Sequence, residues 1–332
     1  MTKNGSESLS ASIAASIAAS TYRGLSSMEL VSNQIKVIVI PELGGKIVSL
    51  LYKPTGKEWL VDAGSRELRP VPYGADFAKA DMSGWDECFP TINVCSYPAD
   101  GSHKGKLLPD HGELWCIPWT CSAEPNTLVC RAEGRALPYT FTRKLRFISE
   151  NKLRFDYEVT NTGGEGEPLS VLWTAHPQFA VTEHTRIELP ESITELLVVN
   201  GGSRLERGKL YRWPDGDDAA NPLQLNRIGP AARQDCRKLY ADGPVAEGWA
   251  GLAEADSGEM LRLEWPIEQV SYLGIWIDES LVNDRPVCAL EPSNGFYDSL
   301  EEAYRRDRLL RIGSGETACW HLDVELGHRS IH

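Results

Sequence analysis

The chain has 332 residues, of which 42% are hydrophobic and 24% are charged, a composition typical of a globular protein with a sizeable core. Its formal net charge of -13 makes nucleic acids and anionic membrane surfaces poor partners. No run of about 18 consecutive apolar residues is present, so the sequence predicts no transmembrane helix.

The first segment of the chain breaks its short apolar stretches with serines and lacks the basic start of a signal peptide. We interpret residues 1–21 as a disordered or weakly ordered tail. A single β-domain is expected over residues 22–332, because no linker or charge run interrupts that part of the sequence.

The chain contains 8 cysteines, and none of them forms a Cys-x-x-Cys pair of the kind that metal sites use. Most lie in apolar, strand-like segments. This pattern predicts buried free thiols and a cytoplasmic protein rather than a disulfide framework. The cysteines are Cys88, Cys95, Cys116, Cys121, Cys130, Cys236, Cys288 and Cys319.

Short runs rich in Val, Ile, Leu and aromatic residues recur between turn residues, as in an antiparallel β protein. The clearest pair covers residues 139–148 and 152–161, where apolar Phe141 and Leu145 alternate with Lys144. A Ser-Glu-Asn turn joins them, so we expect a hairpin with one face toward solvent. The other predicted strands are residues 35–45, 46–53, 168–177, a pair within 248–266, 270–277, 287–292 and 317–326.

Only the segment SLEEAYRRD, residues 299–307, indicates a helix. Ser299 and Glu302 form a capping box, acidic residues begin the first turn and basic residues end the last one. The expected fold class is therefore all-β, with antiparallel sheets and few short helices.

Three segments place a proton-active side chain at a turn or a strand end. His111 lies in DHGELW, His176 lies in AHPQF directly before Pro177, and Glu291 follows the apolar run VCAL. The proline restricts His176 to an extended conformation. Burial of Glu291 after the apolar run would raise the pKa of its carboxyl and fit this group for proton transfer. Each residue alone is also compatible with a structural role, as a hydrogen-bonded histidine or a salt-bridged acid.

In their order and approximate separations, DHGELW, AHPQF and ALEPSNG resemble the aldose 1-epimerase (galactose mutarotase-like) family. The resemblance covers nearly the whole chain from about residue 22. It implies a β-supersandwich fold with an open carbohydrate cleft across one sheet. It also implies that His176 donates a proton to the ring oxygen, that Glu291 accepts the proton of the anomeric hydroxyl, and that His111 binds nearby.

An enzyme of this family interconverts the α and β anomers of a free sugar. Ring opening removes a proton from O1 and delivers one to O5, so a base and an acid must flank C1. The chemistry needs no cofactor and no metal. The expected partner is a small-molecule carbohydrate, bound by a monomer or homodimer.

The sequence departs from the family at the positions that contact the sugar. Galactose-specific members carry an Asn-Arg pair after a glycine, where this chain has Asp86 and Glu87. Two carboxylates would accept hydrogen bonds from sugar hydroxyls and repel a phosphate, which favours a neutral substrate, unless both acids are simply on the surface. Trp85 and Trp276 are candidate platforms for the sugar ring, with core packing as the alternative for Trp276, and Asp242 is a candidate by position.

Three other functions stay open at this point. A non-catalytic sugar-binding protein would keep the cleft but would not need both His176 and Glu291. A glycoside hydrolase would pair Glu291 with Asp86 or Glu87. A zinc site would use His111, His176 and Glu291, although the resemblance implies no metal.

Overall fold

Antiparallel strands dominate the computed structural model, which describes residues 15–216 and 223–330. Most strands belong to a 13-stranded sheet and an 8-stranded sheet, and two small sheets of two strands complete the set. Within this part of the chain, no helix is both long and apolar enough to cross a membrane. The predicted all-β class is confirmed.

The large sheet runs in the order β1-β2-β3-β4-β6-β14-β23-β22-β19-β17-β18, with β5 paired to β4 and β15 paired to β23. Consecutive strands form its first edge, whereas distant segments meet at its centre. Its strands are β1 Ser16–Tyr22, β2 Leu25–Val31, β3 Ile35–Ile40, β4 Lys46–Tyr52, β5 Lys57–Glu58, β6 Trp85–Cys88, β14 Thr174–Pro177, β15 Phe179–Ala180, β17 Glu195–Asn200, β18 Leu210–Arg212, β19 Cys236–Ala241, β22 Tyr272–Asp278 and β23 Val287–Ser293.

The second sheet runs in the order β16-β20-β21-β25-β12-β11-β10-β9. Its strands are β9 Thr120–Glu124, β10 Thr127–Glu133, β11 Tyr139–Ser149, β12 Lys152–Asn161, β16 Thr185–Glu188, β20 Trp249–Glu254, β21 Glu259–Glu264 and β25 Thr317–His328. The small sheets pair β7 Cys95–Ser96 with β8 Leu107–Leu108, and β13 Leu169–Val171 with β24 Leu310–Ile312. The helices are α1 Leu300–Arg305 and four 3-10 turns, η1 Pro41–Leu43, η2 Phe77–Lys79, η3 Leu114–Cys116 and η4 Ala231–Arg233.

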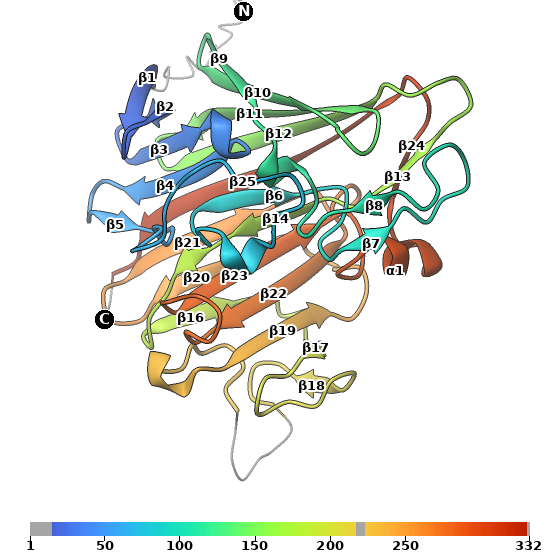
Figure 1. Cartoon of the computed structure of the whole chain (residues 1–332). Coiled ribbons are helices and arrows are strands. Elements are labelled where there is room, and N and C mark those ends of the chain that lie inside the picture. The colour runs from blue at the N-terminus through green and yellow to red at the C-terminus, as the bar shows by residue number, and fades with distance from the viewer. Residues whose placement is uncertain (1–14, 217–222, 331–332) are drawn as a thin grey trace, which may run out of the picture.

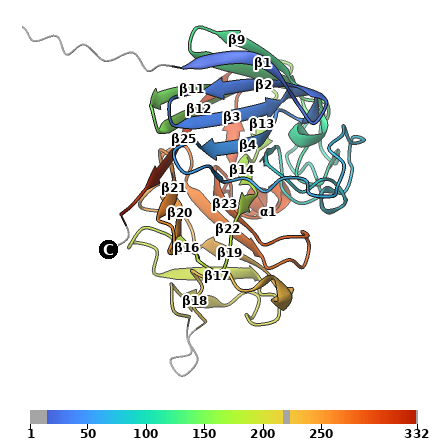
Figure 2. The same ribbon diagram turned by 90° about the vertical axis from the view of Figure 1, so that its left-hand side faces the viewer.

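The two large sheets pack face to face, and the main core fills the space between them (Figures 1 and 2). Aromatic side chains from both sheets meet there. Trp85 of β6 lies 5.1 Å from Phe155 of β12, measured between ring centroids. Because one face of the large sheet is covered in this way, its other face is available for a site.

Alternation along β11 and β12 produces the predicted hairpin. Every second residue of β12 is buried, and the two strands pair from Tyr139 opposite Asn161 to Ser149 opposite Lys152. The predicted helix cap is present as well, since the backbone N–H of Glu302 donates to the side chain of Ser299 at 3.2 Å. Both features were predicted from local patterns alone.

Strand β1 begins at Ser16, inside the segment interpreted as a tail. It pairs with β2 along its whole length, from Ser16 opposite Val31 to Tyr22 opposite Leu25. The predicted boundary at residue 22 was therefore several residues too late, while the prediction for residues 1–14 lies outside the described residues. The Ala- and Ser-rich sequence of β1 lacks the β-branched pattern that identifies most strands.

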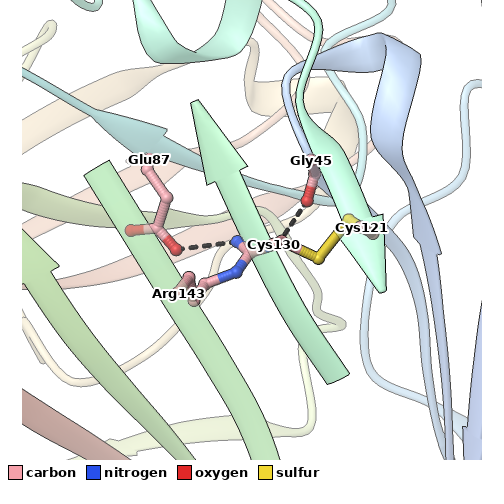
Figure 3. The surroundings of a disulfide bond; sticks show 5 residues. All are labelled: Gly45, Glu87, Cys121, Cys130 and Arg143. Carbon is pink, nitrogen blue, oxygen red and sulfur yellow. Dashed lines mark hydrogen bonds and ion pairs between the residues drawn. A yellow bond between two sulfur atoms is a disulfide. The ribbon is translucent and has the colours of Figure 1, made fainter. Parts of the chain in front are cut away.

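A buried ion pair joins the two sheets. Arg143 of β11 and Glu87 of β6 are both fully buried, and Arg143 Nη1 donates to Glu87 Oε1 at 2.9 Å. Figure 3 shows the guanidinium between this carboxylate and the carbonyl of Gly45, which accepts a second hydrogen bond. Tyr157 and the indole of Trp173 also donate to Glu87, so its charge is well compensated.

The expectation that all cysteines are free thiols was wrong for one pair. Cys121 and Cys130 form a disulfide between β9 and β10 (Figure 3). The short turn between these strands places the two residues directly opposite each other. Six cysteines are free, four of them buried as predicted: Cys88, Cys95, Cys236 and Cys288, with Cys116 half-buried and Cys319 exposed.

Candidate active site

Strands β14 and β23 are neighbours in the large sheet and carry two of the predicted site residues. His176 lies on β14 and Glu291 lies on β23. His176 Nε2 is 3.8 Å from Glu291 Oε1. Two motifs that are far apart in sequence therefore meet through strand pairing.

His111 reaches the same place from the loop after β8. Its ring lies 4.9 Å from that of His176, measured between centroids. The three residues His111, His176 and Glu291 line one cavity of about 370 Å³, a volume suited to a small ligand.

A left-handed turn holds His111 in position. Its φ is 57°, and its backbone N–H donates to the carbonyl of Ile92 at 2.5 Å. The next residue must be glycine, since a Cβ on Gly112 would lie 2.1 Å from the carbonyl oxygen of Phe89. A positive φ is uncommon outside glycine, so the surrounding contacts enforce this turn.

Two neighbours fix the orientation of the His111 ring. Its Nδ1 lies 2.9 Å from Oδ1 of Asp110, and Phe77 stacks on it with a centroid distance of 4.1 Å. Burial opposes ionisation of Asp110, but the hydrogen bond and charge of His111, together with the backbone N–H groups of Phe77 and His111, outweigh it and lower the pKa of the carboxyl. A carboxylate on Nδ1 places the other ring nitrogen toward a ligand.

Glu291 is the most buried member of the group, at 1% exposed. Its Oε2 accepts a hydrogen bond from the ammonium of Lys238, whereas its Oε1 has no hydrogen-bond partner within residues 15–216 and 223–330. Burial raises the pKa of Glu291, and the neighbouring Lys238 offsets only part of this rise. One oxygen is thus held and the other is open to accept a proton.

His176 is also buried, and burial lowers its pKa well below the ordinary value. The nearby charges of His111, Lys238 and Lys46 lower it further. The imidazole is therefore neutral at neutral pH, with one N–H to donate and one lone pair to accept. Any proton that it takes up is readily passed on.

Trp276 lines the cavity, as the platform hypothesis requires. It lies on β22, and its indole N–H donates to the sulfur of Cys236 at 3.0 Å. The indole is half-buried, so part of its surface is open to a ligand.

Asp86 does not reach into the groove as predicted, nor does it lie on the surface. It pairs in register with His176, but it is 1% exposed and its Oδ2 accepts a hydrogen bond from Lys46 Nζ at 2.6 Å. Burial raises its pKa to about 6, against the lowering effect of Lys46. Asp86 therefore lies beside His176 on the neighbouring strand but is not among the residues that line the cavity.

Glu87 and Trp85 lie on the opposite face of β6, in the core. Glu87 is the partner of Arg143, and Trp85 packs on Phe155 and Phe179. Because successive residues of a strand point to opposite faces, β6 sends Asp86 and Glu87 in different directions. Neither Glu87 nor Trp85 contacts the cavity, which corrects both predictions.

Asp242, a candidate substrate-binding residue by position, also lies outside the site. It follows the end of β19, is exposed, and does not line the cavity. Two residues of β19 do line the cavity, Cys236 and Lys238.

Several residues of the site gave no local signal in the sequence. Lys238 contacts Glu291, and its Nζ is 3.9 Å from Oδ1 of Asp298, which accepts a hydrogen bond from Tyr240 at 2.5 Å. Burial alone would lower the pKa of Lys238, but the two carboxylates raise it, so the ammonium stays charged. An alternating lysine in a strand is usually a solvent-facing residue, and only the position of β19 beside β22 reveals this role.

Several solved structures share this fold at very low sequence identity. A galactose mutarotase-like protein from Clostridium acetobutylicum superposes with a TM-score of 0.68 at 14% identity, covering 95% of this chain and 99% of that one. A galactose mutarotase-like protein from Lactobacillus casei gives 0.62 at 16%, covering 94% and 100%. An aldose epimerase homologue from C. elegans gives 0.60 at 12%, covering 96% and 100%.

No protein-family model matches the sequence, and no curated protein matches it. The structural likeness therefore shows the fold, which is galactose mutarotase-like over nearly the whole chain, as the resemblance of the three motifs implied.

Proposed function

We propose that this protein is an aldose 1-epimerase that interconverts the anomers of a free, neutral sugar by acid/base ring opening and closure. One observation carries the proposal. The open Oε1 of buried Glu291 lies 3.8 Å from Nε2 of His176 in the wall of a cavity of ligand size. A hemiacetal needs such a pair, with one group for O1 and one for O5.

In the proposed reaction, Oε1 of Glu291 accepts the proton of the O1 hydroxyl as the bond between C1 and O5 breaks. His176, once it has taken up a proton, gives this proton to O5 and returns to the neutral imidazole, so that the open-chain aldehyde carries no charge. Rotation about the C1–C2 bond presents the other face of the carbonyl. Ring closure reverses both transfers and returns each group to its starting state.

The raised pKa of Glu291 favours this role, because a base with a pKa nearer neutrality accepts a proton more readily than an ordinary glutamate. His111 is the third member of the site. With its ring fixed by Asp110 and Phe77, it would bind the ring oxygen or a neighbouring hydroxyl.

The charges around the cavity favour a neutral substrate. Asp110, Glu291 and Asp298 line it, and the ammonium of Lys238 is already paired with two of these carboxylates. A phosphate in the cavity would face like charge at short range. Asp86 and Glu87, from which the sequence predicted a neutral substrate, lie outside the cavity and do not contribute to this charge.

Of the rival functions, the glycoside hydrolase loses its second carboxylate. A glycoside hydrolase pair with Glu291 is not formed by Glu87, which is bonded to Arg143 in the core, or by Asp86, which is bonded to Lys46. Among the residues that the structure describes, no group of three or more His, Cys, Asp or Glu side chains is arranged to hold a metal ion. A sugar-binding protein without activity is the alternative that the following experiment tests.

The test is polarimetry on freshly dissolved α-D-glucose and α-D-galactose. Wild-type protein should speed the approach to anomeric equilibrium, and Glu291→Gln and His176→Gln should each lower the rate at least ~100-fold, the usual scale for an acid/base group. His111→Asn should act partly through KM. Asp242→Asn, an acid-to-amide change outside the cavity, is the matched control and should keep the wild-type rate.

Thermal melting of each variant separates loss of activity from loss of folding. Wild-type turnover by a folded Glu291→Gln protein would remove this residue from the mechanism. Tight sugar binding without any acceleration would instead indicate a non-catalytic sugar-binding protein.

A further inference from the structure

The proposed catalytic cavity continues into a second cavity. Asn93, Asn200 and Asp298 line both spaces, so the two meet along this wall. The second cavity has a volume of about 760 Å³, larger than the first. A free monosaccharide bound at Glu291 would leave this additional space without a ligand.

The position of the junction sets the direction in which a substrate would extend. The ammonium of Lys238 contacts Glu291 and lies 3.9 Å from Asp298. The Lys238 ammonium therefore lies between the proposed base and Asp298, which lines both cavities. A pyranose with C1 at Glu291 and His176 would point its far side, which carries O4, toward the second cavity.

The side chains of the second cavity suit hydroxyl groups. Asn93 and Asn200 offer amides that both donate and accept hydrogen bonds, and Arg207 offers a guanidinium. The charges are balanced by sign, since Arg207, Arg306, Asp298 and Glu302 all line this cavity, and Arg306 Nε donates to Glu302 at 2.8 Å. A balanced, polar surface favours a neutral polyhydroxylated ligand over an anion.

The wall of this second cavity is preformed. Tyr297 stacks on Tyr240 at a centroid distance of 5.1 Å with an interplanar angle of 13°, and the guanidinium carbon of Arg306 lies 5.4 Å from the centroid of the Tyr297 ring. Tyr240 is in turn bonded to Asp298 at the junction. A rigid wall lowers the ordering cost of binding a ligand there.

We propose that the second cavity binds a second sugar unit, so that the substrate is a reducing disaccharide or longer oligosaccharide with its reducing end in the catalytic cavity. This inference rests on the proposed function. It adds the substrate class, and it requires that the linkage leave the reducing unit on the side opposite C1. A 4-linked unit meets this requirement, whereas a 2-linked unit would lie beside the reacting carbon.

Exchange NMR at anomeric equilibrium tests the proposal, because it measures interconversion rates for any reducing sugar. The probes are glucose, the 4-linked disaccharides maltose and cellobiose, the 2-linked disaccharide sophorose, and glucose 6-phosphate. We expect kcat/KM for at least one 4-linked disaccharide to exceed that for glucose by ~10-fold, the effect of one or two additional hydrogen bonds. Sophorose should not show this gain.

Arg207→Ala is the informative variant. Its exposed guanidinium has no hydrogen-bond or ion-pair partner among the described residues, so truncation should leave the fold intact. We expect the ratio of kcat/KM for the 4-linked disaccharide to that for glucose to fall at least ~5-fold. Arg131→Ala removes an exposed arginine from β10 of the other sheet and should leave the ratio unchanged.

The outcomes distinguish the two proposals. If no sugar is interconverted, the proposed function fails. If glucose and the 4-linked disaccharides react equally well and Arg207→Ala affects neither ratio, the second sugar site is excluded while the function stands. If glucose 6-phosphate is preferred and Arg207→Ala removes that preference, the second cavity recognises phosphate and the oligosaccharide proposal is overturned.

Discussion

Lys238 sets the ionisation of the proposed base. Its ammonium contacts Oε2 of Glu291, which counteracts part of the rise that burial causes in the pKa of the carboxyl. Lys238 acts on the reaction through Glu291, as a positioning residue. Its role is therefore visible in the pH dependence of the rate rather than in the rate alone.

Replacing Lys238 should move the acidic limb of the pH profile. Activity requires ionised Glu291, so kcat/KM should fall as the pH drops through a pKa that lies above the ordinary value of 4.5. Loss of an opposite charge at this distance raises a carboxyl pKa by about 1 to 3 units. Lys238→Met should shift the acidic limb to higher pH by that amount, and Lys238→Arg should shift it less. A limb that stays in place in Lys238→Met would show that the lysine does not tune the base.

Glu87 has a structural role instead of the substrate-binding role expected from the sequence. Removing one partner of a buried ion pair leaves an uncompensated charge, which costs about 3–5 kcal/mol. Glu87→Gln should therefore lower the free energy of unfolding by an amount of this order, measured by urea denaturation. Activity per folded molecule should change little, because Glu87 is separated from the cavity by the sheet.

The matched control for Glu87→Gln is Asp156→Asn on β12. Asp156 pairs with Arg146 on the solvent face of the β11–β12 hairpin. Exposed pairs contribute at most about 1 kcal/mol. Equal destabilisation by the two variants would contradict a special role for the buried pair.

At the scale of elements, strand β6 explains why Asp86 and Glu87 were misplaced. The segment GWDECFP is not among the strands predicted from the sequence, and both acids were expected to contact the sugar or to lie on the surface. It is a strand between β4 and β14, so Asp86 faces Lys46 and Glu87 faces Arg143. Arg143 lies among the apolar residues of β11, which was a sequence signal that a buried carboxylate must exist.

The β9–β10 hairpin carries a disulfide that should stabilise this edge of the second sheet. Cys121 and Cys130 are separated by 9 positions, and closing a loop of this size stabilises a protein by roughly 2–3 kcal/mol in the chain-entropy treatment. Cys130→Ser, or reduction of the wild type, should lower Tm by a few degrees. The exposed free cysteine provides the control, since Cys319→Ser should leave Tm unchanged.

Thiol alkylation of unreduced, unfolded protein followed by mass spectrometry checks the pairing directly. It should label the six free cysteines and leave Cys121 and Cys130 unmodified. Modification of all cysteines would show that this hairpin is not cross-linked in the isolated protein.

At the scale of the whole molecule, the proposed chemistry belongs to side chains alone. His176, Glu291 and His111 supply the acid, the base and the sugar contact, so exhaustive treatment with EDTA should leave kcat within about twofold of the untreated value. Metal analysis of the same sample should find less than stoichiometric zinc. Inactivation by EDTA that is reversed only by Zn²⁺ would favour the metal site considered from the sequence.

Local patterns in the sequence determined the fold class and many of the elements. Period-two alternation predicted the β11–β12 hairpin, and the Ser299 capping box predicted the helix. The order of three short motifs pointed to the fold and to His111, His176 and Glu291, which the structure brings to one cavity. The hairpin and the helix cap depend on residues that are close in the chain, and each of the three motifs is itself a short local segment. Such local information is present in a single sequence.

The tertiary structure alone decided which distant segments lie side by side. Strand order places β19 beside β22 and so brings Lys238 to Glu291, leaves Asp242 outside the site, and sets Asp298 at the junction of two cavities. A strand pattern specifies which residues share a face but not which strand pairs with it. That pairing is set by packing of the whole core, and it determined both the partner of the base and the proposed second sugar site.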